Sequence, residues 1–199
     1  MSTIEFYFDF VSPYAYLASL ELPKIAAKHG CTIDFKPINL GAAKEAAGNT
    51  APPTAAIPAK LNYVMADFAR WCARYGEKLE FSREGPPVTE PANRGVFYAQ
   101  DRGQVAEYVK AMWAATFGSG GLHGKEEVLR EVAEGLGWDA DDFLAYVASD
   151  EAAARYAEAN EAAQANGVFG VPIMIVNDQM WWGNDRLDFL DEYLAENCA

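Results

Sequence analysis

Histidine, paired cysteine and basic charge are scarce in this 199-residue sequence, and each scarcity argues against a class of function. His29 and His123 are the two histidines, and neither has a partner at metal-ligand spacing, so we expect no bound metal. Cys31, Cys72 and Cys198 lie far apart, and no two of them form a Cys-x-x-Cys pair. An odd number of unpatterned cysteines indicates free thiols.

Basic charge and long apolar runs are also limited. The chain has 16 Lys and Arg against 29 Asp and Glu, a net charge of -13, so it offers no basic surplus to a nucleic-acid partner. No apolar run is long enough to span a bilayer. A strand pattern follows the first residue almost at once and leaves no room for a signal peptide. We therefore expect a cytoplasmic protein without a membrane or nucleic-acid partner.

What the sequence does contain is a strand–helix–strand pattern at its beginning and a hairpin near its end. Residues 3–10 are β-rich, residues 13–29 have helical periodicity, and residues 31–38 are β-rich again, which predicts a right-handed parallel βαβ unit. Pro23 predicts a kink or a restart of that helix. Residues 173–176 and 180–182 flank a turn at 177–179 and predict a hairpin, which a last helix through Leu194 follows.

The segment between these ends reads as helical. Residues 39–57 predict a loop that can hold a short helix, residues 59–75 a helix, residues 82–93 a proline-rich loop, and residues 94–164 about four helices. The prediction is an α/β fold. Residues 1–40 and 166–199 form a thioredoxin-like core (βαβ…ββα), and residues 41–165 form a large all-helical insertion with connecting loops.

Ser12 lies at the predicted strand-to-helix turn, where a thioredoxin-like fold would carry Cys-x-x-Cys. The four residues from Ser12 to Ala15 contain no cysteine, which disfavours a thiol oxidoreductase. Ser12 followed by Pro13 is also an ordinary helix start. Both interpretations hold together, because a hydroxyl beside free helix N–H groups can stabilise a thiolate. A serine-hydrolase nucleophile is disfavoured, since the Gly-x-Ser-x-Gly elbow is missing.

Two further segments carry candidate binding residues. Pro172 opens the predicted strand at 173–176, where thioredoxin-like folds hold a cis proline, and Val171 would offer its backbone to an extended peptide ligand. Asn184 and Asp185 precede the last helix and are either caps or a site for a carboxylate and an ammonium group. One helix start for a thiol and another for an amino-acid end suggest glutathione.

The second loop region adds Asn49 and Lys60. A lone lysine on a helix is usually a solvated residue, but Lys60 could neutralise a carboxylate if its helix starts at the pocket.

These segments together resemble 2-hydroxychromene-2-carboxylate isomerases and, more broadly, kappa-class glutathione transferases with a DsbA-like fold. The resemblance covers essentially the whole chain and rests on residues 8–17 (FDFVSPYAYL), 58–60 (PAK), 167–172 (GVFGVP) and 182–187 (WGNDRL). It implies glutathione binding and a homodimer.

The resemblance also implies the following roles for single residues: Ser12 beside the glutathione sulfur, Val171 and Pro172 against its backbone, Asn184 and Asp185 at its γ-glutamyl end, and Asn49 and Lys60 near glutathione or substrate.

The resemblance further implies an isomerase of aromatic (naphthalene-type) degradation. It would interconvert 2-hydroxychromene-2-carboxylate and trans-o-hydroxybenzylidenepyruvate by reversible addition of the glutathione thiolate. Two alternatives stay open: a kappa-like transferase that consumes glutathione in conjugating electrophiles, and a non-catalytic glutathione-binding module.

Overall fold

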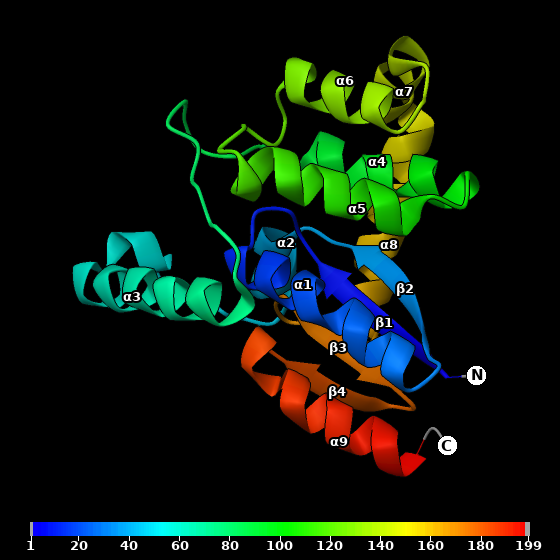
Figure 1. Cartoon of the computed structure of the whole chain (residues 1–199). Coiled ribbons are helices and arrows are strands. Elements are labelled where there is room, and N and C mark those ends of the chain that lie inside the picture. Colours follow the sequence, from blue (N-terminus) through cyan, green and yellow to red (C-terminus); the bar gives the residue numbers. More distant parts are fainter. Residues whose placement is uncertain (1, 198–199) are drawn as a thin grey trace.

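A four-stranded sheet with helices on both faces forms the lower half of the molecule in Figure 1, a computed structural model that describes residues 2–197. Its strands are β1 (Thr3–Phe8), β2 (Thr32–Pro37), β3 (Ile173–Val176) and β4 (Gln179–Trp182), in the order β2-β1-β3-β4. β1 is parallel to β2 and antiparallel to β3, and β3 and β4 form the hairpin. The βαβ unit and the hairpin predicted from the two ends of the sequence are confirmed.

The side chains of β1 alternate between two cores, because successive residues of a strand point to opposite faces. Ile4, Phe6 and Phe8 are fully buried in the larger apolar cluster. Tyr7 points the other way, into a smaller cluster with Ile173. The sheet is therefore covered on both faces.

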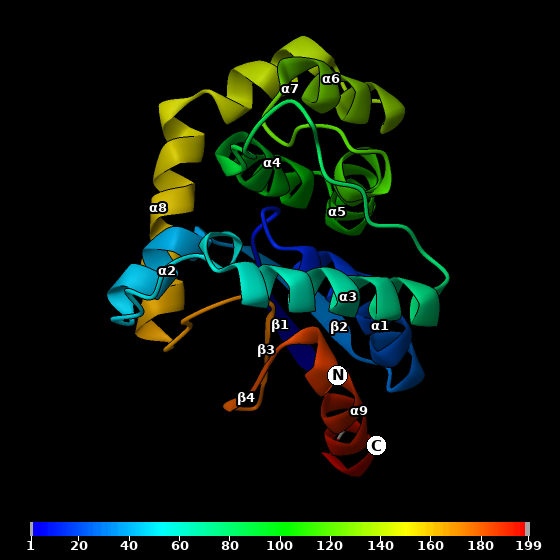
Figure 2. The ribbon, with the colours of Figure 1, turned by 90° about the vertical axis from the view of Figure 1, so that its left-hand side faces the viewer.

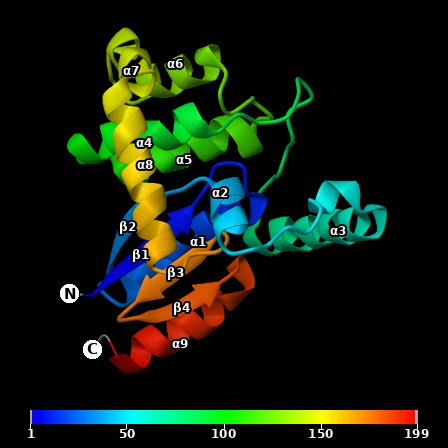
Figure 3. The same cartoon turned by 180° about the vertical axis from the view of Figure 1, so that it is seen from behind.

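Four helices cover these two faces. α1 (Pro13–Lys28) and α9 (Leu187–Asn197) contribute to the larger cluster, and α2 (Leu40–Ala46) and α8 (Asp150–Ala165) contribute to the smaller one. α1 lies in front of the strands in Figure 1, and α8 lies in front of them in the reverse view of Figure 3. Figure 2 shows α1 and α8 on opposite sides of the strands.

The remaining helices form a second layer above the sheet in Figure 1 and one arm beside it. The arm is α3 (Pro58–Tyr75), which a short 3-10 turn, η1 (Thr54–Ala56), precedes. The upper layer contains α4 (Glu90–Asp101), α5 (Val105–Trp113) with a π-helical extension η2 (Ala114–Gly118), α6 (Glu126–Gly135) and α7 (Ala140–Val147), and α8 descends from it to the sheet. The segment predicted to hold about four helices thus holds five α-helices, α4 to α8, among the described residues.

The upper layer shares the larger core with the sheet. Trp113 of α5 packs its ring 4.6 Å from the ring of Phe10 and 6.3 Å from that of Phe8. Trp113 is 1% exposed. The end of β1 is therefore covered by the helical layer.

Two proline-based predictions need correction. The restart expected at Pro23 does not occur, because Leu22, Ile25 and Ala26 on either side are buried and packing holds α1 together as one helix. A kink at Pro23 stays a prediction. The loop predicted to end at residue 93 ends earlier, since Pro91 lies in the first turn of α4, where its missing N–H has no helical partner to lose.

Candidate functional site

The strand register brings most of the predicted site residues to one end of the sheet. Tyr7 near the end of β1 pairs with Ile173 at the start of β3, and Ile173 pairs with Trp182 at the end of β4. Ser12 follows β1, Pro172 precedes β3, and the 3-10 turn η3 (Asn184–Arg186) follows β4. These residues therefore lie around the same sheet end.

Ser12 occupies the N-cap of α1, as its local sequence predicts. Its Oγ accepts a hydrogen bond from the Ala15 N–H at 3.2 Å, and Pro13 takes the first helical position. The Ser12 N–H donates to the Asp9 carbonyl at 2.9 Å, which closes the turn between β1 and α1. Ser12 is 7% exposed, and among the described residues its hydroxyl hydrogen has no acceptor. The hydroxyl can therefore donate to an anion at the positive end of α1.

The peptide bond between Val171 and Pro172 is cis, as the resemblance implied. Val171 is 8% exposed. The Pro172 carbonyl accepts a hydrogen bond from the Gly183 N–H at 2.9 Å, which ties the start of β3 to the residue before Asn184. Backbone geometry thus links the second and third candidate segments directly.

Gly183 shapes the turn that presents Asn184 and Asp185. Its φ is +106°, and a Cβ there would lie 2.5 Å from Asp185 Oδ1, so the position requires glycine. Asn184 is 3% exposed, and its Nδ2 has no hydrogen-bond partner among residues 2–197. Asp185 forms an exposed ion pair with Arg186 at 2.9 Å. The buried Asn184 amide is therefore the polar group at this turn that lacks a partner of its own.

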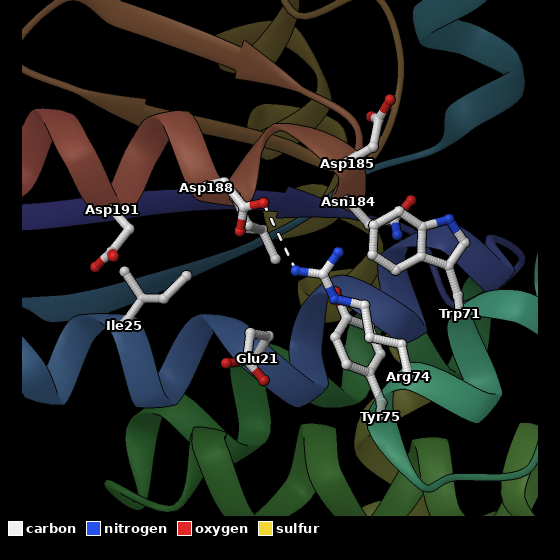
Figure 4. A pocket seen from close by; sticks show the side chains of 10 residues that line it. Glu21, Ile25, Trp71, Arg74, Tyr75, Asn184, Asp185, Asp188 and Asp191 are labelled. Carbon is white, nitrogen blue, oxygen red and sulfur yellow. Dashed lines mark ion pairs between the residues drawn. The ribbon is translucent and has the colours of Figure 1, made fainter.

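A cavity of about 220 Å³ opens beside Asn184, between α1, α3 and the start of α9. Its lining is formed by Glu21, Ile25, Trp71, Arg74, Tyr75, Asn184, Asp185, Leu187, Asp188 and Asp191. Figure 4 shows Asp185 pointing away from the other acidic side chains, Glu21, Asp188 and Asp191. The cavity holds groups of both signs, which suits a zwitterionic ligand end.

Arg74 and Tyr75 form the α3 side of this cavity. Arg74 is 3.6 Å from an Asp188 oxygen, and its guanidinium lies 5.3 Å from the centre of the Trp71 ring (Figure 4). Burial raises the pKa of Tyr75, and the charge of Arg74 first and the nearby Asn184 amide second oppose that rise. Tyr75 therefore stays a neutral hydroxyl, and Arg74 carries the positive charge.

The structure does not bring Asn49 or Lys60 to the sheet end through any hydrogen bond or ion pair among the described residues. Asn49 is exposed after α2, and its Oδ1 accepts from the Ala51 N–H at 3.3 Å. Lys60 is exposed in the first turn of α3. Their roles stay predictions.

Sequence reasoning missed the polar groups that surround the Ser12 turn. Asp9 is 4% exposed and accepts hydrogen bonds from several chain segments. Tyr14 donates to Asp67 of α3 at 3.1 Å, and burial first and then that carboxylate raise the pKa of Tyr14. The sequence contains one signal for Asp9, which is its place as an acidic residue directly after an apolar strand.

His123 was also missed, because a single histidine in a glycine-rich loop has no pattern. It is 3% exposed and packs 4.9 Å from the Phe117 ring. Burial lowers the pKa of His123 to about 4, opposed by the Phe10 backbone nearby. Neither ring nitrogen forms a hydrogen bond of normal geometry with the described residues.

A series of aromatic ring contacts runs from Tyr14, after Ser12, to Phe10, before it. From Tyr14 the contacts pass to Phe68 at 4.8 Å, to Phe81 at 6.0 Å and then to Phe117 at 5.7 Å. They return through Trp113 to Phe10. Phe81 is 42% exposed. Packed aromatic rings thus hold the Ser12 turn against α3 and the helical layer, and Phe81 is the ring of this series that stays exposed.

Residues 2–197 contain no cluster of three His, Cys, Asp or Glu side chains placed to hold a metal ion. Their helices include none whose length and apolar character would let it cross a membrane.

Comparisons of the sequence and of the structure with known proteins point to the same family. The model of the DSBA-like thioredoxin domain matches residues 3–195. A 2-hydroxychromene-2-carboxylate isomerase of Sphingobium xenophagum is 40% identical over 194 residues, which cover 98% of this chain and 98% of that protein. A shorter match, 40% identical over 68 residues, is to Glutathione S-transferase kappa 1 of Caenorhabditis elegans and covers 34% of this chain and 29% of that protein.

A solved structure of a 2-hydroxychromene-2-carboxylate isomerase superposes on this one with a TM-score of 0.93. The two chains are 38% identical, and the superposition covers 98% of this chain and 96% of the other. The thioredoxin-like core with a helical insertion is therefore the fold of this protein. The chain belongs to the DSBA-like thioredoxin domain family and, within it, to the 2-hydroxychromene-2-carboxylate isomerase family.

Proposed function

We propose that this protein is a glutathione-dependent isomerase that interconverts 2-hydroxychromene-2-carboxylate and trans-o-hydroxybenzylidenepyruvate. The observation that carries the proposal is the hydroxyl of Ser12 at the start of α1, in the place of a redox thiol and beside the Pro172 strand. Full-length relatives that bear the isomerase name support it.

The residues around the sheet end fit glutathione. Ser12 offers a hydroxyl donor and the positive end of a helix to a thiolate, and both lower a thiol pKa. The buried Asn184 Nδ2 lines the cavity and has a hydrogen-bond donor to spare. Arg74 can attract a carboxylate, and Asp185 an ammonium group. These are the two charged groups of a γ-glutamyl end.

When bound, glutathione supplies a thiolate that adds reversibly to the conjugated double bond of the ring-opened substrate and so permits rotation about it. Ser12 donates a hydrogen bond that keeps the sulfur anionic at the start of α1. Lys60 has no ion-pair partner among the described residues and is available to the substrate carboxylate. Asn49 is assigned to the glutathione or substrate side by the resemblance. Holding both reactants at one sheet end supplies the entropic advantage.

An ultraviolet assay tests the proposal. Conversion of 2-hydroxychromene-2-carboxylate is followed with and without glutathione, and free thiol is titrated at the end. Conversion that requires glutathione and leaves all thiol free is the expected result. Loss of thiol in step with substrate would instead indicate a kappa-like transferase. Binding of glutathione without turnover on a panel of electrophiles would indicate a non-catalytic module.

We also propose that the protein acts in the cytoplasm and that it is a homodimer, the dimer being what the resemblance implies. Light scattering on the purified chain, whose mass is 21.8 kDa, tests the dimer directly. A mass of one chain at all concentrations would contradict it.

A further inference from the structure

Asp9 forms the centre of a buried polar cluster directly before the Ser12 turn. Its carboxylate accepts four hydrogen bonds. Val11 N–H, Thr89 Oγ1 and Asn93 Nδ2 donate to Oδ1 at 3.1, 2.7 and 3.0 Å, and Leu40 N–H donates to Oδ2 at 2.9 Å. A carboxylate can satisfy all four donors at once, because it is an acceptor on both oxygens.

The four donors belong to different parts of the chain. Val11 lies in the Ser12 turn, Leu40 begins α2, Thr89 precedes α4 and Asn93 lies within α4. Figure 2 shows α2 and α4 on different levels of the molecule, with the β1–α1 turn between them. One side chain therefore joins the turn, the sheet side and the helical layer.

Asn93 extends this cluster into the helical layer. It is fully buried, and its Nδ2 also donates to the Tyr156 hydroxyl of α8 at 3.0 Å. Its Oδ1 accepts from the Phe10 N–H at 3.4 Å. The backbone N–H groups of Phe10 and Val11 are thus both held by this cluster, while the Ser12 N–H binds the Asp9 carbonyl at 2.9 Å.

We propose that Asp9 is a positioning residue for Ser12, through which α4 and α8 of the helical layer fix the turn that carries the hydroxyl. Three consecutive N–H groups, those of Phe10, Val11 and Ser12, end on Asp9 or on its partner Asn93. The carboxylate binds the Val11 N–H directly and holds Asn93, which binds the Phe10 N–H, so it fixes the backbone that leads into Ser12. Asp9 does not touch the reacting atoms. Its kinetic consequence rests on the proposed function, whereas its structural consequence does not.

Two substitutions separate the contacts. In Asp9→Asn the amide oxygen can keep the three donors at Oδ1, but the amide nitrogen then faces the Leu40 N–H, a donor against a donor. Thr89→Val removes one donor and keeps the shape of the side chain. Asp141→Asn is the matched control, because that carboxylate pairs with Arg130 between α6 and α7 on the surface and lines neither the cavity nor the Ser12 turn.

The first readout is amide hydrogen exchange of folded protein, which needs no ligand. We expect Asp9→Asn and Thr89→Val to accelerate exchange at Val11, Ser12 and Ala15, while the control leaves these amides unchanged. Unchanged exchange at these amides in both variants would overturn the proposal, whether or not the wild-type protein is an isomerase.

The second readout is the kinetics of the isomerase reaction together with the pKa of the bound glutathione thiol. We expect Asp9→Asn to lower kcat by about tenfold to a hundredfold, as small misplacements of a reacting group do. The KM for glutathione should change much less, and the pKa of the bound thiol should rise. A variant that is only less stable would keep the wild-type kcat and thiol pKa per folded molecule, and that result would also overturn the proposal. Thr89→Val keeps the test decisive if Asp9→Asn does not fold.

Discussion

Ser12 uses its hydroxyl in two directions at once. The oxygen accepts from the Ala15 N–H and caps α1, and the hydrogen has no acceptor among the described residues. A serine can do both, because a hydroxyl has one donor and two acceptor positions. The capping role and the thiolate role therefore do not compete.

Ser12→Ala separates these two roles by magnitude. Losing one hydrogen bond to a charged group costs roughly 1.5–3 kcal/mol, so we expect turnover to fall by about 10- to 150-fold. Losing the cap costs about 0.5–2 kcal/mol of stability. Steady-state kinetics and urea unfolding measure the two effects.

Ser149→Ala is the matched control for that experiment. Ser149 also caps a helix, α8, with its Oγ accepting from the Ala152 N–H at 3.1 Å, and its hydroxyl donates in addition to the Tyr146 carbonyl at 2.6 Å. Ser149→Ala should therefore lose at least as much stability as Ser12→Ala and keep full turnover. Equal turnover in both variants would remove Ser12 from the mechanism.

Asn184 is a different case, because its buried Nδ2 lies near the Tyr75 hydroxyl but forms no hydrogen bond of normal geometry with the described residues. Replacing an unpartnered buried amide by an apolar side chain of similar shape is nearly neutral or stabilising. We therefore predict that Asn184→Leu unfolds at an equal or higher temperature than the wild type. The same variant should bind glutathione at least about tenfold more weakly, the effect of roughly 1.4 kcal/mol.

Calorimetry measures both quantities for Asn184→Leu. A lower unfolding temperature together with unchanged affinity would show that Asn184 serves the fold and not the ligand.

At the scale of elements, His123 connects the end of η2 to the β1–α1 turn, and its burial makes stability depend on pH. The folded protein holds the pKa of His123 at about 4, below its ordinary value of 6.5. The unfolded chain thus binds the proton more readily between these values. Stability from this group is complete above pH 6.5 and is lost as the pH falls toward 4.

The predicted loss is up to about 3 kcal/mol across that interval. Urea unfolding at a series of pH values measures it, and His123→Phe should flatten the part of the slope that this residue causes. An identical slope in the variant would assign the acid sensitivity to other groups.

The elements with local sequence rules were predictable. The βαβ unit, the start of α1 at Pro13 and the final hairpin all follow from periodicity or from turn residues. Even there, the turn consists of Asn177 and Asp178 alone, since both have positive φ and β4 begins at Gln179.

Elements and site groups that depend on distant contacts were not predictable. Continuity of α1 through Pro23 comes from burial of its neighbours. The donors around Asp9 come from residues up to 84 positions away, in α4. Tyr63 of α3 is 62% exposed, because α3 packs mainly through Phe68. Sequence periodicity shows which face is apolar, but not what will cover it.

At the scale of the whole molecule, one apolar cluster extends across the boundary between the thioredoxin-like core and the helical insertion. The larger cluster includes Phe6 and Phe8 of the sheet, Trp113 of α5, and Phe143 of α7. The Asp9 contacts cross the same boundary. The two parts therefore share buried area and hydrogen bonds, even though the chain alternates between them.

This shared core predicts a single cooperative unfolding transition. We expect near-ultraviolet circular dichroism, which reports packed aromatic rings, and far-ultraviolet circular dichroism, which reports helices, to change at the same urea concentration. The upper layer contains α4, α5, α6 and α7. If this layer unfolded separately from the sheet, the far-ultraviolet and near-ultraviolet curves would have different midpoints. Trp113→Ala tests the cause, because it removes the ring that contacts both Phe8 and Phe10 and leaves a cavity costing about 3–5 kcal/mol. In that variant the two curves should separate, with the helical layer unfolding first. Curves that still coincide would show that contacts other than Trp113 join the two parts.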